Sequence, residues 1–337
     1  MKILENIPLA EYTTFKIGGP ARYFCIVKND KDLLMAVKFA KEKKLRFMVL
    51  GGGSNLLISD AGYDGLVIKN EYMGVRFIGK RVIAAAGEMW DELIETTLTH
   101  GLSGLENLSA IPGTVGAAPV QNLGAYGVDA SEKIVSVRVL DCSFMKWKKL
   151  SKADCKFDYR DSMFKHHKGR YIVTEVEFEL SDKGEVNIGY KDIRDYFDQK
   201  GITKATPAEV RQAVIDARWG KLPDWKMWGT AGSFFKNPMI SLHDFNELKK
   251  KYPELPGFAE ANDKNRVKVS LAWILDKVCH AKDVAVGKAS IYEKHALVFI
   301  ARPGATADEV VKLSHKLMLL VKEKTGIDIE AEVEWVN

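Results

Sequence analysis

Ser233 is a hydroxyl side chain between a glycine and two bulky aromatic residues, in the segment GTAGSFFKNP (229–238). A serine in such a place can form a turn, cap a helix, bind a phosphate, act as a nucleophile or donate a proton. The hydrolase motif G-x-S-x-G is excluded, because Phe235 stands where its second glycine would be and the segment supplies no histidine base. The segment alone favours a helix cap, so the role of Ser233 depends on the rest of the chain.

A glycine-rich loop in the first part of the chain has residue types that suit an anion. The segment LGGGSNLLISD (50–60) places Gly51, Gly52 and Gly53 before Ser54 and Asn55. Glycines let backbone N–H groups approach a phosphate, and the serine and asparagine can add donors. The loop has neither the Gly-Lys-Ser/Thr ending of a Walker loop nor the G-x-G-x-x-G fingerprint. By itself it is either a phosphate-binding turn or a tight structural turn.

A second glycine-rich loop, SAIPGTVGAAPVQNLGAYG (109–127), favours the first of these alternatives. Its glycines and amide side chains are Gly113, Gly116, Gly124, Gly127, Gln121 and Asn122. Two such loops, about 60 residues apart with strands between them, suit a diphosphate-bridged cofactor that is held at both ends.

The elements around these loops predict a mixed α+β architecture. A strand over 21–27, a helix over 30–44 and a buried strand over 46–50 lead directly into the first loop. A helix over 88–101 precedes the second loop, and alternating strands are expected over 133–141 and 171–180.

The second half predicts a compact α/β unit from about 219 to 329. Two helices begin with capping boxes, at Thr206 and at Thr306, and Gly220 and Gly326 are expected just past their ends. A short helix over 268–278, a strand over 296–301 and a terminal strand over 329–337 complete the pattern.

Composition narrows the class of protein. With 337 residues, 46% of them hydrophobic and 28% charged, the chain is long enough for more than one globular domain. The net charge of +5 comes from scattered basic runs, so no nucleic-acid partner is expected. Neither a signal peptide nor a membrane span of about 18 apolar residues is visible, so we expect a cytoplasmic protein without a membrane partner.

The thiols and imidazoles favour structural roles. Four widely spaced cysteines, Cys25, Cys142, Cys155 and Cys279, predict reduced, partly buried thiols. The adjacent pair His166 and His167 has no carboxylate-rich partner motif, so we expect a loop or surface pair and no metal site.

Five separated motifs resemble, in their order, the UDP-N-acetylenolpyruvoylglucosamine reductase (MurB) family, and they cover nearly the whole chain. The motifs are GGGSNLLISD, AIPGTVGAAPVQNLGAYG, FDYRDSMFK, GTAGSFFKNP and IEAEVEWV. The resemblance implies an α+β architecture: a vanillyl-alcohol-oxidase/PCMH-type FAD-binding fold of two α/β subdomains plus a C-terminal α/β substrate-binding domain. The implied domains are 1–70 with 330–337, then 71–218 with the Tyr190 loop, then 219–329.

The resemblance also implies a reaction. NADPH reduces a non-covalently bound FAD, which then reduces the enolpyruvyl group of UDP-N-acetylglucosamine enolpyruvate in peptidoglycan precursor synthesis. Hydride transfer from flavin N5 to C3 leaves charge at C2, delocalised into the neighbouring carboxylate. Such an intermediate requires charge stabilisation at the carboxylate and a proton for C2 from a positioned acid. The only partner expected is this small-molecule substrate, and the protein is expected to be a monomer.

Three catalytic roles follow from the motif register. Arg160 would bind the carboxylate through its guanidinium fork, Glu332 would share the stabilisation of charge, and Ser233 would donate the proton to C2. The residues after the family's glutamate are commonly Arg, an aromatic and an aliphatic. Here they are Glu334, Trp335 and Val336, so any role of that arginine is in doubt.

Without the resemblance, two of these residues have simpler interpretations. Arg160 would be a surface ion pair with Asp158 or Asp161. Glu332 would lie on the outward face of an alternating strand, together with Glu330 and Glu334.

The remaining site residues also follow from the resemblance. The implied cofactor contacts are Gly51, Gly52, Gly53, Ser54, Asn55, Pro112, Gly113, Gly116, Gln121, Asn122, Gly124 and Arg218. Tyr190 would close over the substrate on its loop, Lys221 would bind the uridine diphosphate and Asn237 would be a further substrate contact. Phe234 and Phe235 are expected to pack in the core.

Two alternatives remain open from the sequence. One is an oxidase of the same flavoprotein fold, which would react rapidly with oxygen. The other is a non-catalytic nucleotide-binding module, which would have no need for Arg160, Ser233 and Glu332 together.

Overall fold

The computed structural model describes residues 1–259 and 263–337, and these residues form two compact units. The first unit comprises residues 1–7, 21–53 and 63–220, and the second comprises 8–20, 54–62 and 221–337. Two short segments of the N-terminal part therefore belong to the second unit. The three domain ranges inferred from the sequence stay a prediction.

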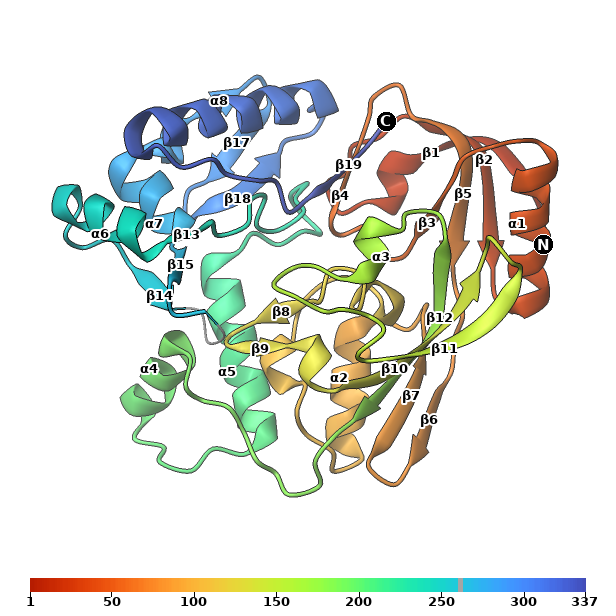
Figure 1. The fold of residues 1–337 in the computed structure, drawn as a ribbon, viewed down its shortest axis with the longest axis horizontal. Coiled ribbons are helices and arrows are strands. Elements are labelled where there is room, and N and C mark those ends of the chain that lie inside the picture. The colour runs from red at the N-terminus through yellow and green to blue at the C-terminus, as the bar shows by residue number, and fades with distance from the viewer. Residues whose placement is uncertain (260–262) are drawn as a thin grey trace. The chain divides into compact units, whose positions relative to one another are not determined.

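The first unit begins with a four-stranded sheet in the order β1 (Leu4–Pro8), β2 (Pro20–Val27), β5 (Tyr63–Asn70), β3 (Phe47–Leu50). Strands β2 and β3 both run parallel to β5, and the helix α1 (Asp30–Glu42) connects them (Figure 1). The predicted helix and both strands are confirmed to within two residues. Because β3 ends at Leu50, the first glycine-rich loop starts at the carboxyl edge of this sheet, where open α/β sheets bind ligands.

A five-stranded antiparallel sheet forms the second layer of this unit. Its order is β11 (Lys146–Ser151), β10 (Ile134–Asp141), β12 (Tyr171–Glu179), β7 (Arg81–Ala85), β6 (Val75–Ile78). The helix α2 (Trp90–Thr99) contributes the fully buried Trp90, whose Nε1 donates to the Leu108 carbonyl at 3.0 Å. The predicted strands and helix are confirmed. The second glycine-rich loop follows α2 and ends in a two-stranded ribbon, β8 (Gly124–Ala125) and β9 (Val128–Asp129).

Three further helices belong to the first unit: α3 (Met163–His166), α4 (Lys191–Lys200) and α5 (Pro207–Lys221). The predicted capping box of α5 is present, with the Glu209 amide donating to Thr206 Oγ1 at 3.3 Å. The prediction that Gly220 lies past the end of this helix is wrong. Gly220 lies inside α5, and it does not adopt the left-handed backbone that terminates a helix.

The second unit contains two small antiparallel sheets, in the orders β13 (Met239–Ser241), β15 (Arg266–Val269), β14 (Gly257–Ala259) and β16 (Ala285–Val286), β17 (Ala289–Tyr292), β18 (His295–Ala301). Its helices are α6 (Leu242–Lys251), α7 (Leu271–Trp273), which continues as a π-turn over Ile274–Val278, and α8 (Ala307–Thr325). The capping box of α8 at Thr306 and its end at Gly326, with φ of 75°, are confirmed.

The chain terminus joins the second unit through long-range pairing. Strand β4 (Leu56–Ile58) runs parallel to the terminal strand β19 (Glu334–Val336). The predicted strand over 329–337 is thus too long, since only its last residues form a ladder. Glu332 lies outside that strand, so its interpretation as part of an alternating outward face is wrong.

The thiols are buried, and the histidine pair lies at the surface as expected. All four cysteines are buried and free, and burial raises the pKa of the Cys25 thiol to about 12. His166 is exposed and lies 2.7 Å from Asp161, and within residues 1–259 and 263–337 no three His, Cys, Asp or Glu side chains gather as metal ligands.

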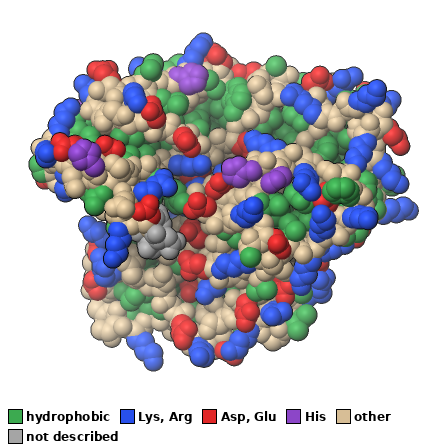
Figure 2. Space-filling model, viewed as in Figure 1, with side chains coloured by type: hydrophobic (Ala, Val, Ile, Leu, Met, Phe, Trp, Pro, Cys, Tyr) green, Lys and Arg blue, Asp and Glu red, His purple; other side chains and the backbone are tan. Residues whose placement is uncertain are grey.

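The surface mixes charges of both signs. Basic and acidic side chains are interspersed over the face shown in Figure 2. Among the described helices, none carries an apolar stretch long enough to cross a bilayer.

Candidate active site

The two glycine-rich loops contact each other backbone to backbone within the first unit. A Cβ atom on Gly52 would lie 2.6 Å from Gly113 Cα, and one on Gly51 would lie 2.5 Å from Thr114 Oγ1. A Cβ on Gly116 would lie 2.6 Å from the Ala86 side chain. Gly51 and Gly52 of the first loop are therefore in contact with Gly113 and Thr114 of the second, and a larger residue at either position would push the loops apart.

Thr114 adds a hydroxyl to this contact that sequence reasoning missed. Its side chain is 3% exposed, and Oγ1 is buried without a hydrogen-bond partner among the residues that the structure describes. A buried hydroxyl normally finds a partner, so an unpaired one beside two glycine-rich loops indicates a bound acceptor. The signal was present in the sequence, because Thr114 directly follows Gly113 in IPGTVG. Glycine backbone and a donor hydroxyl are what a diphosphate requires, so these residues fit the implied cofactor.

Gly52→Ala should abolish tight FAD binding, because a Cβ 2.6 Å from the Gly113 backbone must separate the loops. We expect an increase in the FAD dissociation constant of at least about 100-fold in a fluorescence titration, equivalent to roughly 3 kcal/mol. Gly220→Ala is the matched control, since a Cβ at Gly220 meets nothing within 4 Å and the residue is helical. Equal FAD affinity in both variants would show that the loop contact is not needed for the cofactor.

Arg218 supports the second loop from α5. Its Nε donates to the Ala110 carbonyl at 3.2 Å, while the Ala110 amide donates to Asp91 Oδ1 at 2.6 Å. Asp91 in turn forms an ion pair with Arg211 at 2.5 Å. These contacts hold Ala110 at a φ of 57°, a left-handed conformation that is uncommon for alanine. Arg218 therefore positions the loop; its direct contact with the cofactor stays a prediction.

Arg160 lies against the end of the second loop and is 16% exposed. Its guanidinium contacts the Gly124 carbonyl, pairs with Asp129 at 3.2 Å and lies 3.4 Å from the Asn122 carbonyl. The predicted surface pair with Asp158 or Asp161 does not account for these contacts. A Cβ on Gly124 would lie 2.5 Å from Arg160 Nη1, which explains the glycine at that position.

Asn122 has internal partners for its side chain. Its Nδ2 donates to the Asp158 carbonyl at 2.9 Å, and its Oδ1 accepts from the Ser131 amide at 3.1 Å. The side chain is buried, so it shapes the loop. The neighbouring loop residues Pro112 and Gln121 are half-buried, and their predicted cofactor contacts stay predictions.

Tyr190 lies directly before α4 and packs against the end of the second glycine-rich loop. Its ring packs edge-on against Tyr126 with centroids 5.2 Å apart, and its Cβ lies 3.9 Å from the ideal Cβ position of Gly127. The side chain is 44% exposed, and its partial burial raises the pKa of the phenol. Asn107 Nδ2 connects the second loop to the segment before Tyr190, because it donates to the Tyr126 carbonyl at 3.2 Å and to the Asn187 carbonyl at 2.8 Å.

In the second unit, the Ser233 segment lies between two neighbouring stretches of chain. The Phe234 amide donates to the Leu297 carbonyl in β18 at 2.8 Å, and the Phe234 carbonyl accepts from the Glu332 amide at 2.8 Å. Phe234 stacks on Phe299 with ring centroids 4.2 Å apart, which confirms that the phenylalanines pack in the core. The backbone of Glu332 is therefore paired with that of Phe234, the residue that follows Ser233.

Ser233 itself does not cap a helix. It forms an isolated β-bridge with Val298, and Gly232 before it has a φ of 72°, which a glycine adopts without strain. This turn fixes the backbone of Ser233 while its side chain stays partly accessible.

Asn55 links the first glycine-rich loop to the Glu332 segment within the second unit. Its Nδ2 donates to the Glu332 carbonyl at 3.1 Å, and its own carbonyl accepts from the Glu334 amide at 3.0 Å. The predicted cofactor residues Ser54 and Asn55 thus start the stretch that leads into β4. Asn55 positions Glu332 whether or not it also contacts a cofactor.

The two remaining predicted substrate residues have different settings. Asn237 Oδ1 accepts from the Leu271 amide at 3.0 Å at the start of α7. Lys221 is the exposed last residue of α5. Neither placement tests a substrate contact.

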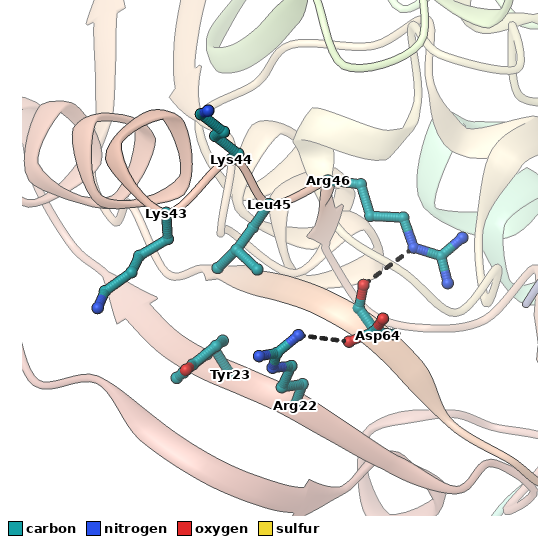
Figure 3. Close-up of a pocket in the computed structure, with 7 residues that line it drawn as sticks. All are labelled: Arg22, Tyr23, Lys43, Lys44, Leu45, Arg46 and Asp64. Atoms are coloured by element: carbon teal, nitrogen blue, oxygen red, sulfur yellow. Dashed lines mark hydrogen bonds and ion pairs between the residues drawn. The ribbon is translucent and has the colours of Figure 1, made fainter.

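A separate hollow in the first unit is lined by Arg22, Tyr23, Lys43, Lys44, Leu45, Arg46 and Asp64. Arg22 pairs with Asp64 at 3.0 Å, and Arg46 Nε donates to the Asp64 carbonyl at 3.1 Å. Figure 3 shows the ammonium groups of Lys43 and Lys44 pointing away from each other. Both arginines are engaged with Asp64 and the two ammonium groups diverge, so the hollow gives no argument for a second anion site.

Comparisons with known proteins were consistent with this arrangement. Residues 21–143 match the family model described as FAD binding domain, and residues 224–336 match UDP-N-acetylenolpyruvoylglucosamine reductase, C-terminal domain. A UDP-N-acetylenolpyruvoylglucosamine reductase from Chromobacterium violaceum is 39% identical over 98% of both chains. One from Neisseria gonorrhoeae is 38% identical, covering 97% of this chain and 96% of its own.

A solved structure shows the same fold. The UDP-N-acetylenolpyruvylglucosamine reductase (MurB) from Thermus caldophilus aligns with a TM-score of 0.69 over 100% of this chain and 98% of its own, at 24% identity. The predicted FAD-binding fold with an additional C-terminal domain is confirmed.

Proposed function

Because the chain belongs to the UDP-N-acetylenolpyruvoylglucosamine reductase family, we propose that it reduces UDP-N-acetylglucosamine enolpyruvate to UDP-N-acetylmuramate, with FAD as cofactor and NADPH as reductant. The observation that carries the proposal is the pairing of the Ser233 segment with the Glu332 segment. It brings a hydroxyl and a carboxylate to neighbouring stretches of one unit. The product is a precursor of peptidoglycan.

The glycine-rich loops hold the cofactor in this proposal. Gly51, Gly52 and Gly113 present backbone to the diphosphate, and Thr114 donates its buried hydroxyl. When bound, FAD would take up a hydride from NADPH and pass it to the substrate. Arg218 and Asp91 keep the second loop in its strained conformation at Ala110.

The chain's own side chains handle the charge and the proton. Arg160, oriented by Asp129 and the Gly124 carbonyl, stabilises the substrate carboxylate as charge develops on it. Glu332 shares this role as a protonated hydrogen-bond donor. Ser233 donates its proton to C2, which works by position, since a neutral serine is a weak acid. Tyr190, Lys221 and Asn237 bind the substrate.

An anaerobic mixing experiment tests the proposed function. NADPH should bleach the flavin absorbance of the purified protein, and UDP-N-acetylglucosamine enolpyruvate should restore it. No bleaching, or bleaching that the substrate does not reverse, would contradict the reductase activity. Rapid recovery with oxygen, but not with substrate, would indicate an oxidase instead.

We also propose that the protein works as a cytoplasmic monomer, because its proposed substrate is a soluble nucleotide sugar and all the proposed site residues belong to one chain. Light scattering on a sizing column should then give a mass near 37.7 kDa. A mass of twice that value would contradict the monomer.

A further inference from the structure

Lys69 lies directly behind the first glycine-rich loop. In the parallel pairing of β3 with β5, Lys69 is the partner of Leu50, the residue before Gly51. Its Nζ donates to the Gly51 carbonyl at 2.5 Å. The side chain is half-buried, so this ammonium lies at the carboxyl edge of the sheet with limited access to water.

This hydrogen bond sets the direction of one peptide group. In a trans peptide the carbonyl and the following N–H point in opposite directions. Fixing the Gly51 carbonyl toward Lys69 therefore turns the Gly52 N–H away from Lys69. Among the residues that the structure describes, none accepts a hydrogen bond from the Gly52 amide. That donor is thus available to an anion on the side of the peptide opposite Lys69.

The charge of Lys69 also favours an anion at the Gly52 N–H. A cation that binds a carbonyl polarises the peptide group and strengthens its N–H as a donor. Burial lowers the pKa of Lys69, and the opposing effect of the neighbouring Glu71 carboxylate is smaller. A partly desolvated ammonium gains free energy when an anion binds nearby, because low dielectric strengthens their attraction.

We propose that Lys69 is a positioning residue of the cofactor site. It orients the peptide between Gly51 and Gly52 so that the Gly52 N–H can bind the cofactor diphosphate, and the positive charge of Lys69 attracts the same diphosphate. This inference rests on the proposed function only in taking FAD as the ligand. It adds a cation to a loop whose sequence, GGGSN, contains none.

Lys69→Met removes the ammonium and keeps an unbranched side chain that is one atom shorter. We expect FAD to bind the apoprotein about 10- to 100-fold more weakly, as for the loss of a hydrogen bond to a charged group. Lys41→Met is the matched control, because Lys41 Nζ also donates to a backbone carbonyl of the first unit, that of Cys142 at 2.6 Å. The control should bind FAD like the unaltered protein, and both should melt within a few degrees of it.

Two further ligands, riboflavin and ADP, and the variant Lys69→Arg distinguish a role of Lys69 in orienting the loop from a general loss of structure. Riboflavin lacks the diphosphate, so Lys69→Met should change riboflavin affinity by less than about twofold while ADP competes more weakly. Lys69→Arg keeps the cation and should recover most of the FAD affinity. Equal losses for FAD and riboflavin, or no loss for FAD, would overturn the inference. Failure of the unaltered protein to bind FAD would instead contradict the proposed function.

Discussion

Ser233→Ala is expected to separate the two halves of the reaction. NADPH should reduce the bound flavin at nearly the rate of the unaltered protein, because that step needs no proton at C2. Reoxidation by UDP-N-acetylglucosamine enolpyruvate should be slower by about 10²- to 10⁴-fold, the contribution typical of a positioned proton donor. Stopped-flow absorbance measures both steps separately.

Ser241→Ala is the control for a general effect of losing a serine hydroxyl. Ser241 caps α6 in the same unit, accepting from the Asp244 amide at 3.0 Å, so its loss should cost about 1 kcal/mol of stability. Both half-reactions should keep their rates in that variant. Equal slowing of the two half-reactions in Ser233→Ala would mean that Ser233 supports the structure and does not donate the proton.

Local signals explain why much of the fold was predictable from sequence. The helices α5 and α8 start at capping boxes, and α1 has a buried stripe of Leu33, Ala36, Val37 and Ala40. Such patterns are complete within a few residues of the chain. The error at Gly220 arose because glycine ends a helix only when its backbone becomes left-handed, which composition does not reveal.

Long-range contacts explain what the sequence did not show. The pairing of β4 with β19 joins residues near position 57 to the chain terminus, and it leaves Glu332 outside the strand. Lys69 gains its contact with Gly51 only from the register between β3 and β5. In the sequence Lys69 is one lysine after an apolar run, with nothing to relate it to the loop.

The candidate site shows the same division. The glycines of both loops were predicted from the sequence, and Gly52 lies against Gly113 in the structure. The position of Arg160 depends on its contacts with Asp129 and Gly124, which the sequence does not reveal. Asn122 was predicted as a cofactor contact on its residue type. Its side chain bonds to the Asp158 carbonyl and the Ser131 amide, both outside the loop, and the sequence of the loop does not reveal these partners.

Glu332→Gln should lower kcat/KM by about 10²- to 10³-fold, because the acidic O–H that a protonated Glu332 offers to the developing negative charge is replaced by a weaker amide donor of similar shape. The backbone of Glu332 is held independently of that group. Its amide donates to the Phe234 carbonyl at 2.8 Å, and its carbonyl accepts from Asn55 at 3.1 Å. The melting temperature should therefore change little, and the loss should appear in steady-state kinetics with the enolpyruvyl substrate.

Glu330→Gln provides the matched control two residues away. Glu330 has a side chain that is 80% exposed and lies 3.8 Å from Lys236, a surface ion pair of small energetic value. We expect kcat/KM within about twofold of the unaltered protein, since the exposed charge is screened by solvent. If both substitutions have the same effect on kcat/KM, the two glutamates act through the general charge of the segment. A loss confined to Glu332 would assign the stabilisation of the intermediate to the carboxyl group of the residue whose backbone is held by the Phe234 and Asn55 hydrogen bonds.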